Sequence, residues 1–252
     1  MIKYNTISFD AADTLFFIKE GLGEAYLKIL KKYTNEYKST EISKVFKKHF
    51  NAKKGLHFDS LTGDNLIKAE KDWWYFLVKD IFIELGMFKS FDEYFDELYD
   101  YFSCDAWEIY PDTLPALKNL KKKGYKIIIT SNFDSRIYKV CDKLSITENI
   151  DHFTISSESG FSKPNKEIFY RSLQKVNASP EESMHVGDNY NLDYLPSLEI
   201  GMKPLLIVRD NKLNNNLEAT TINSLNNIMI DPNAKYYYAF TIKRIIIRTK
   251  DY

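Results

Sequence analysis

Five side chains that could act together in phosphoryl transfer follow the predicted strands of this chain. They comprise three carboxylates, one hydroxyl and one ammonium group, from Asp10, Ser131, Lys163, Asp188 and Asp193. In such a set a carboxylate can attack phosphorus, a divalent cation can bridge carboxylate and phosphate oxygens, and the hydroxyl and ammonium groups can neutralise phosphoryl charge. Oxygen ligands at this density suit Mg²⁺. The residue types therefore predict magnesium-dependent phosphoryl transfer.

Each of these residues also has an ordinary structural interpretation when it is taken alone. Asp10 could be a turn residue, and Ser131 could bond only to local backbone. Lysine is abundant in this chain, so Lys163 alone would be read as a surface charge. Asp188 and Asp193 could be helix N-caps. The prediction depends on the fold bringing all five to one place.

The hydrophobic pattern predicts an α/β fold that would do so. Residues 2–9 are loosely strand-like, and short apolar runs follow at YKIIIT, HFTIS, MHV and PLLIV. Helices are expected between these runs, at about 135–144, 165–176 and 190–200. Such alternation implies right-handed crossovers and a Rossmann-like parallel sheet with helices on both faces. Ligands of such sheets bind at the carboxyl ends of the strands, where the five side chains would lie.

From about residue 19 to residue 103 the pattern is helical instead. LIKAEKDWWYFLVKDIFIEL is long enough for five turns, with Trp73, Trp74 and Leu77 among its candidates for burial. We therefore expect a core of residues 1–18 and 104–230, with an all-helical cap of residues 19–103 inserted into it.

Residues 231–252 form a C-terminal extension in this division. Within it Tyr236, Tyr238, Phe240 and Ile242 alternate with other residues, which predicts a strand. Because an exposed strand so rich in aromatic residues would promote aggregation, we expect it to be buried against the core or a partner.

Composition and sequence pattern limit the cellular compartments and the binding partners to be expected. The chain has 35 basic and 35 acidic residues, so its zero net charge gives no bias toward nucleic acid or anionic lipid. Asp10 and Asp13 interrupt the apolar N-terminal stretch before a signal peptide could form, and no segment approaches the roughly 18 uncharged apolar residues of a membrane span. Two cysteines cannot form a disulfide framework. We expect a cytoplasmic protein, a monomer or weak homodimer, that acts on a small molecule and binds neither nucleic acid nor membrane.

The segments FDAADTL, TSNFD, SKPNKEIF and VGDNYNLD, in this order and spacing, resemble the four signature motifs of the haloacid dehalogenase superfamily. The resemblance extends over almost all of residues 7–202 and includes longer or additional segments, among them LGEAY, the Trp73-Trp74 pair, AWEIYPD and SNFDSR. It implies a Rossmann-like core with a helical cap inserted between the first and second motifs. This is the arrangement that the hydrophobic pattern predicts independently.

The resemblance also implies a role for each site residue. Asp10 corresponds to the nucleophile, which forms a covalent aspartyl intermediate, and Ser131 to the hydroxyl that binds the transferred group. Asn132, in the same motif, is expected to contact substrate. Lys163 corresponds to the lysine that neutralises nucleophile and phosphate, and Asp193 to the carboxylate that holds this lysine or a metal-bound water.

The metal site follows from the same comparison. Asp188 corresponds to a direct Mg²⁺ ligand, which we expect to bind the ion together with Asp10 and the backbone carbonyl of Ala12.

Phosphatases of the superfamily carry a second aspartate two residues after the nucleophile, which protonates the leaving oxygen and then activates water. Ala12 occupies that position here, and the adjacent Asp13 should point elsewhere. Loss of a general acid removes roughly 10² to 10⁴ in rate, so ordinary phosphate monoesters should be poor substrates.

Three hypotheses remain. The first is a Mg²⁺-dependent hydrolase for substrates whose leaving group needs little protonation, such as acyl phosphates. The second is a branch of the superfamily without the acid, either 2-haloacid dehalogenases, which use no metal, or phosphonoacetaldehyde hydrolases, which use a cap lysine; Lys53 or Lys54 could serve. The third is a non-catalytic binding protein.

Overall fold

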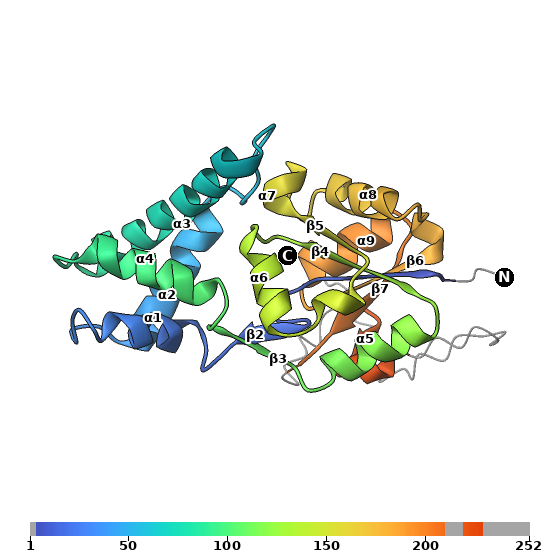
Figure 1. Ribbon diagram of the computed structural model, residues 1–252, viewed down its shortest axis with the longest axis horizontal. Coiled ribbons are helices and arrows are strands. Elements are labelled where there is room, and N and C mark those ends of the chain that lie inside the picture. The colour runs from blue at the N-terminus through green and yellow to red at the C-terminus, as the bar shows by residue number, and fades with distance from the viewer. Residues whose placement is uncertain (1–3, 210–218, 229–252) are drawn as a thin grey trace, which may run out of the picture.

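The computed structural model describes residues 4–209 and 219–228, and its core is a six-stranded sheet (Figure 1). Every pair of neighbouring strands in it is parallel, as the sequence predicts. In spatial order the strands are β5 (His152–Ile155), β4 (Lys126–Ser131), β1 (Thr6–Phe9), β6 (Ser183–Gly187), β7 (Lys203–Ile207) and β8 (Thr221–Ile222). The strand predicted within residues 231–252 lies outside the described residues.

Both faces of the sheet are covered because the central strands are apolar on both sides. In β4, Ile127 and Ile129 belong to one hydrophobic cluster with Leu117, while Ile128 belongs to another with Phe169. The main helices of the core are α5 (Thr113–Lys122), α6 (Arg136–Lys143), α8 (Lys166–Lys175) and α9 (Leu195–Glu199). Shorter helical segments are η1 (Thr147–Asn149), α7 (Ser156–Ser159), η2 (Pro180–Glu182), η3 (Tyr190–Tyr194) and η4 (Leu225–Asn227). The Rossmann-like α/β architecture is thereby confirmed.

A helical insert occupies the chain between β2 (Phe16–Ile18) and β3 (Trp107–Ile109), which pair as an antiparallel ribbon at its base. Figure 1 shows the insert as a separate layer beside the core. Its helices are α1 (Leu22–Leu30), α2 (Ser39–Ala52), α3 (Gly63–Leu85) and α4 (Phe91–Phe102).

The insert has its own hydrophobic cluster, to which Leu30, Leu77 and Tyr94 contribute fully buried side chains. Trp73 and Trp74 do not join these residues at full burial, contrary to the prediction. Both remain half-buried and pack against the edge of this cluster. Within the described residues, even the longest helix is too polar to cross a bilayer.

One of the two tryptophans, Trp74, links the insert to the core. The indole Nε1 of Trp74 donates a hydrogen bond of 2.6 Å to Asp134 in the SNFDSR segment. One turn earlier on α3, the buried Glu70 accepts hydrogen bonds from the backbone N–H of Ser135, at 3.1 Å, and from the Ser135 hydroxyl. These buried polar contacts fix α3 against the start of α6, next to the end of β4.

Candidate active site

The structure brings the five predicted side chains to one edge of the sheet. Asp10 directly follows β1, Ser131 ends β4, and Asp188 directly follows β6. Asp193 lies in η3, and Lys163 precedes α8. Carboxylate oxygens of Asp10, Asp188 and Asp193 all lie within 4.8 Å of one another. Parallel strands end at the same edge, so residues far apart in sequence converge here.

Lys163 is the centre of the cluster. Its Nζ lies 2.6 Å from Oδ1 of Asp10 and 2.5 Å from Oδ1 of Asp193, and its side chain is only 2% exposed. The Ser131 hydroxyl donates to the same Asp10 oxygen at 2.9 Å. Burial alone would lower the pKa of Lys163, but the charges of Asp10 and Asp193 outweigh it and hold that pKa above its ordinary value. The lysine is therefore a permanent buried cation.

The carboxylates respond to this cation differently. Burial raises the pKa of Asp10, against the opposing effect of Lys163. Burial acts in the same direction on Asp193, but Lys163 and a hydrogen bond from His185 together hold the pKa of Asp193 below its usual range. Asp188 keeps solvent-exposed surface at the edge of the site. Desolvation by the surrounding protein, followed by the charges of Asp10, Asp193 and Asp13, raises the pKa of Asp188 to about 8. The Asp188 side of the cluster thus has excess negative charge.

Asn132, predicted to contact substrate, has a structural role in this site. Its side-chain Nδ2 donates to the backbone carbonyl of Lys163 at 2.9 Å, and its Oδ1 accepts from the backbone N–H of Lys163 at 2.7 Å. The amide therefore holds the loop that carries the lysine.

The turn after β6 returns Asp193 to the site. The Asn189 side chain accepts hydrogen bonds from the backbone N–H groups of Asn191 and Leu192, at 3.0 and 3.1 Å, which starts η3. Asp193 then packs on Gly187, where an added Cβ would lie 2.3 Å from the Asp193 Cγ. Any larger residue at position 187 would displace this carboxylate, which is why glycine is required there.

His185 is a further residue of the site that the sequence analysis does not single out. His185 is buried, and its Nε2 lies 3.1 Å from Oδ1 of Asp193. Its Nδ1 lies 2.9 Å from the Ser8 hydroxyl, which contacts the Thr130 hydroxyl at 2.8 Å. The sequence signal for this role is the presence of polar residues within strands that are otherwise apolar and predicted to be buried. This chain of hydrogen bonds holds Asp193 toward Lys163.

Ala12 borders a cavity of about 600 Å³ between the insert and the core, hereafter the interface cavity. Asn132 and Lys163 line it from the core, so it opens directly onto the cluster of candidate site residues. Lys53 and Lys54 line it from the insert. Asp13 is exposed and is not among the described residues that line this cavity.

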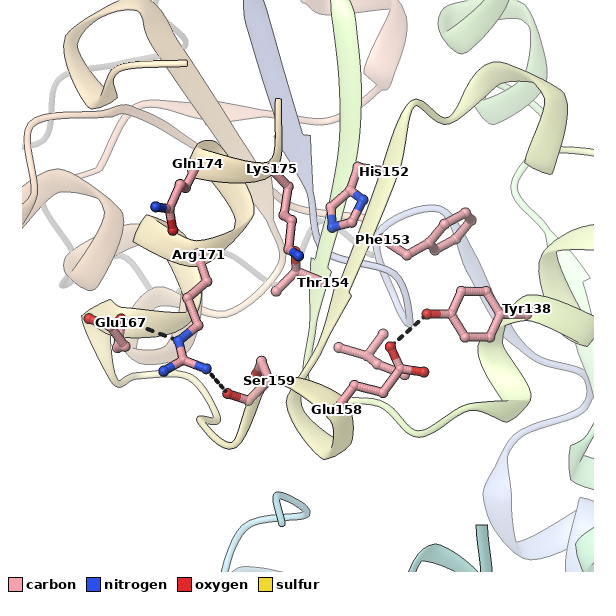
Figure 2. Close-up of a pocket in the computed structure, with 11 residues that line it drawn as sticks. Tyr138, His152, Phe153, Thr154, Glu158, Ser159, Glu167, Arg171, Gln174 and Lys175 are labelled. Carbon is pink, nitrogen blue, oxygen red and sulfur yellow. Dashed lines mark hydrogen bonds and ion pairs between the residues drawn. The ribbon is translucent and has the colours of Figure 1, made fainter. Parts of the chain in front are cut away.

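A second hollow, of about 500 Å³, lies at β5, which forms one edge of the sheet (Figure 2). Its lining includes His152, Glu158 and Arg171. The Arg171 guanidinium donates to the Ser159 carbonyl at 2.8 Å, and the Tyr138 hydroxyl donates to Glu158 at 2.8 Å. None of the predicted site residues contributes to this hollow, so it is separate from the candidate site.

Comparison with known proteins identifies the family. The family model of haloacid dehalogenase-like hydrolases matches residues 4–199. The chain belongs to the haloacid dehalogenase-like hydrolase family. It is similar to haloacid dehalogenase-like hydrolase domain-containing protein 3 of Bos taurus, with 25% identity over 209 residues that cover 82% of each chain.

One further relative of this hydrolase and one solved structure with a similar fold are phosphatases by name. The glyceraldehyde 3-phosphate phosphatase of Methanothermobacter thermautotrophicus is 31% identical over 127 residues, 47% of this chain and 56% of that protein. The crystal structure of a HAD phosphatase from Thermococcus onnurineus superposes with a TM-score of 0.63 at 21% identity, covering 89% of this chain and 95% of that one. Solved L-2-haloacid dehalogenases share the fold as well, so superposition alone assigns the fold and not the reaction.

The buried lysine of this haloacid dehalogenase-like hydrolase makes a testable contribution to stability. In Lys163→Met the carboxylates of Asp10 and Asp193 lose their shared cation but stay buried. Breaking a buried ion pair in this way costs about 3–5 kcal/mol, so the free energy of unfolding in urea, measured with EDTA present, should fall by that amount.

The matched control is Lys166→Met, three residues further along the chain. Lys166 pairs with Glu199 at 2.9 Å, but both side chains are largely exposed, so this variant should unfold close to wild type. Equal stability of Lys163→Met and Lys166→Met would show that Lys163 does not neutralise the cluster.

Proposed function

We propose that the chain is a phosphohydrolase in which Asp10 is the nucleophile. The observation that supports this most strongly is that a single oxygen of Asp10, Oδ1, accepts hydrogen bonds from both Lys163 Nζ and the Ser131 hydroxyl, each within 2.9 Å. A cation and a hydroxyl donor beside one carboxylate are what a phosphoryl group needs at the point of attack. Asp188 and Asp193 beside Asp10 favour this reaction over the metal-free dehalogenase alternative.

The residues divide the work between two steps. An Asp10 carboxylate oxygen bonds to phosphorus while the bond from phosphorus to the leaving oxygen breaks, and the electron pair stays on that oxygen. Water then cleaves the aspartyl phosphate, which releases inorganic phosphate and restores Asp10. In both steps Lys163 and Ser131 stabilise the phosphoryl oxygens, and Asp193 keeps Lys163 in place. Asn132 supports the same position from the Lys163 backbone.

The donor set of the site fits Mg²⁺. Its oxygens come from carboxylates, and the excess negative charge around Asp188 is of the kind that a divalent cation neutralises. We assign Asp10, Asp188 and the backbone carbonyl of Ala12 as the protein ligands. When bound, the ion supplies positive charge to the phosphoryl oxygens.

Ala12 restricts the substrates of this site. Without a carboxyl group at position 12, no side chain of the first motif protonates the leaving oxygen in the first step or activates water in the second. The substrates should therefore be phosphates whose leaving group departs without a proton, such as acyl phosphates. The insert, residues 19–103, would act as the cap that excludes water around the bound substrate.

Metal dependence tests this function. Hydrolysis of acetyl phosphate should require Mg²⁺ and stop in EDTA. In Asp188→Asn one ligand loses its charge, so the Mg²⁺ concentration for half-maximal rate should rise by at least about tenfold. Phosphate release across a Mg²⁺ titration measures both effects.

The matched control is Asp72→Asn, which removes an exposed carboxylate from α3 and should leave the titration unchanged. Hydrolysis that persists in EDTA, at the same rate in Asp188→Asn as in wild type, would contradict the metal assignment.

A further inference from the structure

The wall of the interface cavity is rich in aromatic side chains, although it lies next to a charged cluster. Phe50, Trp73 and Trp74 contribute to it from the insert, with Tyr99 and Phe102 beside them. Phe50 is 43% exposed, and its ring stacks on that of Trp74 with centroids 6.2 Å apart. Trp73 meets Trp74 edge to face at 5.0 Å. Aromatic surface left open inside a cavity favours an apolar ligand with a flat ring.

The charged groups of the cavity are partly engaged already. The Arg136 guanidinium donates to both carboxylate oxygens of Asp134, at 2.9 and 2.6 Å, and lies 4.1 Å from the centre of the Tyr99 ring. Lys53 Nζ lies 5.3 Å from the centre of the Trp73 ring. These cations pack against aromatic rings, which extends the apolar wall.

In the described part of the chain, the cavity also lacks carboxyl and imidazole groups. Among the residues that the structure describes, no aspartate, glutamate or histidine lines it, and Ala12 stands at its boundary with the site. A leaving group seated there can receive no proton from a carboxyl or imidazole group of the wall. The aromatic wall thus favours a leaving group that carries an apolar ring, and the lack of carboxyl and imidazole groups among the described lining residues favours one that departs as an anion.

We propose that the substrate is a small aryl phosphate, with its ring in the interface cavity and its phosphoryl group on Asp10. This inference rests on the proposed function and adds the class of leaving group. A phenol has a pKa of about 10, far below that of an aliphatic alcohol, so a phenolate leaves without a general acid. In the reaction the Asp10 oxygen bonds to phosphorus, the bond from phosphorus to the aryl oxygen breaks, and the phenolate takes its proton from solvent.

The test compares three substrates on wild type: 2-naphthyl phosphate, phenyl phosphate and acetyl phosphate. The two aryl phosphates have leaving groups of similar acidity but different ring size. We expect KM for 2-naphthyl phosphate to be lower than that for phenyl phosphate by about tenfold, because the larger ring buries more apolar surface. Phe50→Ala should reduce the preference for 2-naphthyl over acetyl phosphate, as the ratio of kcat/KM, by about 5-fold to 10-fold.

Phe76→Ala is the control, because Phe76 is 54% exposed on the same insert and does not line the cavity. Calorimetry with 2-naphthol reports on the cavity without catalysis. Wild type and Phe76→Ala should bind it alike, and Phe50→Ala more weakly by about 5-fold to 10-fold.

The outcomes separate the two proposals. Hydrolysis of acetyl phosphate with no preference between the aryl phosphates, and no binding of 2-naphthol, overturns the aryl inference and leaves the phosphohydrolase intact. Binding of 2-naphthol without hydrolysis of any of the three phosphates overturns the proposed function and the aryl phosphate as substrate, and supports an aromatic ligand for a non-catalytic protein.

Discussion

Asp10→Asn should lower the hydrolysis of acetyl phosphate by at least about 10⁴-fold, because an amide oxygen is too weak a nucleophile to form the aspartyl phosphate. The substitution changes the charge of the side chain and almost none of its volume. It also keeps an oxygen that can accept from Lys163 and Ser131, which donate to Asp10 within 2.9 Å. The rate of phosphate release at saturating Mg²⁺ measures the effect.

Asp13→Asn is the matched control for this variant. Asp13 is exposed and has a positive φ of 60°, a conformation that asparagine tolerates well. Its charge influences Asp188, but we place it outside the reaction, so its loss should change the rate less than about tenfold. An Asp10→Asn variant as active as Asp13→Asn would contradict the assignment of the nucleophile.

Ala12→Asp should raise the hydrolysis of an alkyl phosphate, such as glycerol phosphate, by about 10² or more. The new carboxyl group would protonate the leaving alkoxide and then activate water. The wild-type site has no side chain at position 12 for either function. Ala12 lines the interface cavity, so a larger side chain has space there. The gain with acetyl phosphate should be smaller, because only the second step of its hydrolysis would use the new carboxyl group.

Ala12→Asn, which has the same size without the acid, separates proton transfer from a change of shape and should show no gain. Mg²⁺ binding must be verified for each variant, since the backbone carbonyl of residue 12 is a proposed ligand. Equal and negligible rates for wild type and Ala12→Asp on both substrates, with Mg²⁺ bound, would favour the non-catalytic binding protein.

The sheet was predictable because its strands are buried on both faces. The run Ile127, Ile128 and Ile129 is apolar throughout, which indicates a central parallel strand and places Ser131 at its end. The ribbon of β2 and β3 was not predictable, because each strand has three residues and too little alternation to detect. The predicted helix at 190–200 is divided into η3 and α9, where the Asn189 cap first turns the chain back toward the site.

The candidate site was predictable in its membership but not in its contacts. The carboxyl ends of parallel strands lie at one edge of the sheet, so Asp10, Ser131 and Asp188 follow from their places at the ends of predicted strands. Side-chain packing across four segments places Lys163 between Asp10 and Asp193, and it also places His185 against Asp193. Hydrophobic periodicity does not encode such contacts. Trp74 is a further example of a contact that the sequence does not predict. The helical periodicity around it is the same whether its side chain faces the interior of the insert or a cavity.

The most direct test of the account is to look for the covalent intermediate in the wild-type protein. Because Ala12 leaves water without a general base in the second step, the aspartyl phosphate should accumulate during turnover. We predict that acid quenching in the presence of Mg²⁺ and acetyl phosphate, followed by peptide mass spectrometry, finds one phosphoryl group on Asp10, with none in Asp10→Asn and less in Ala12→Asp. Steady release of phosphate with no phosphoryl group on Asp10 at any quench time would contradict the mechanism.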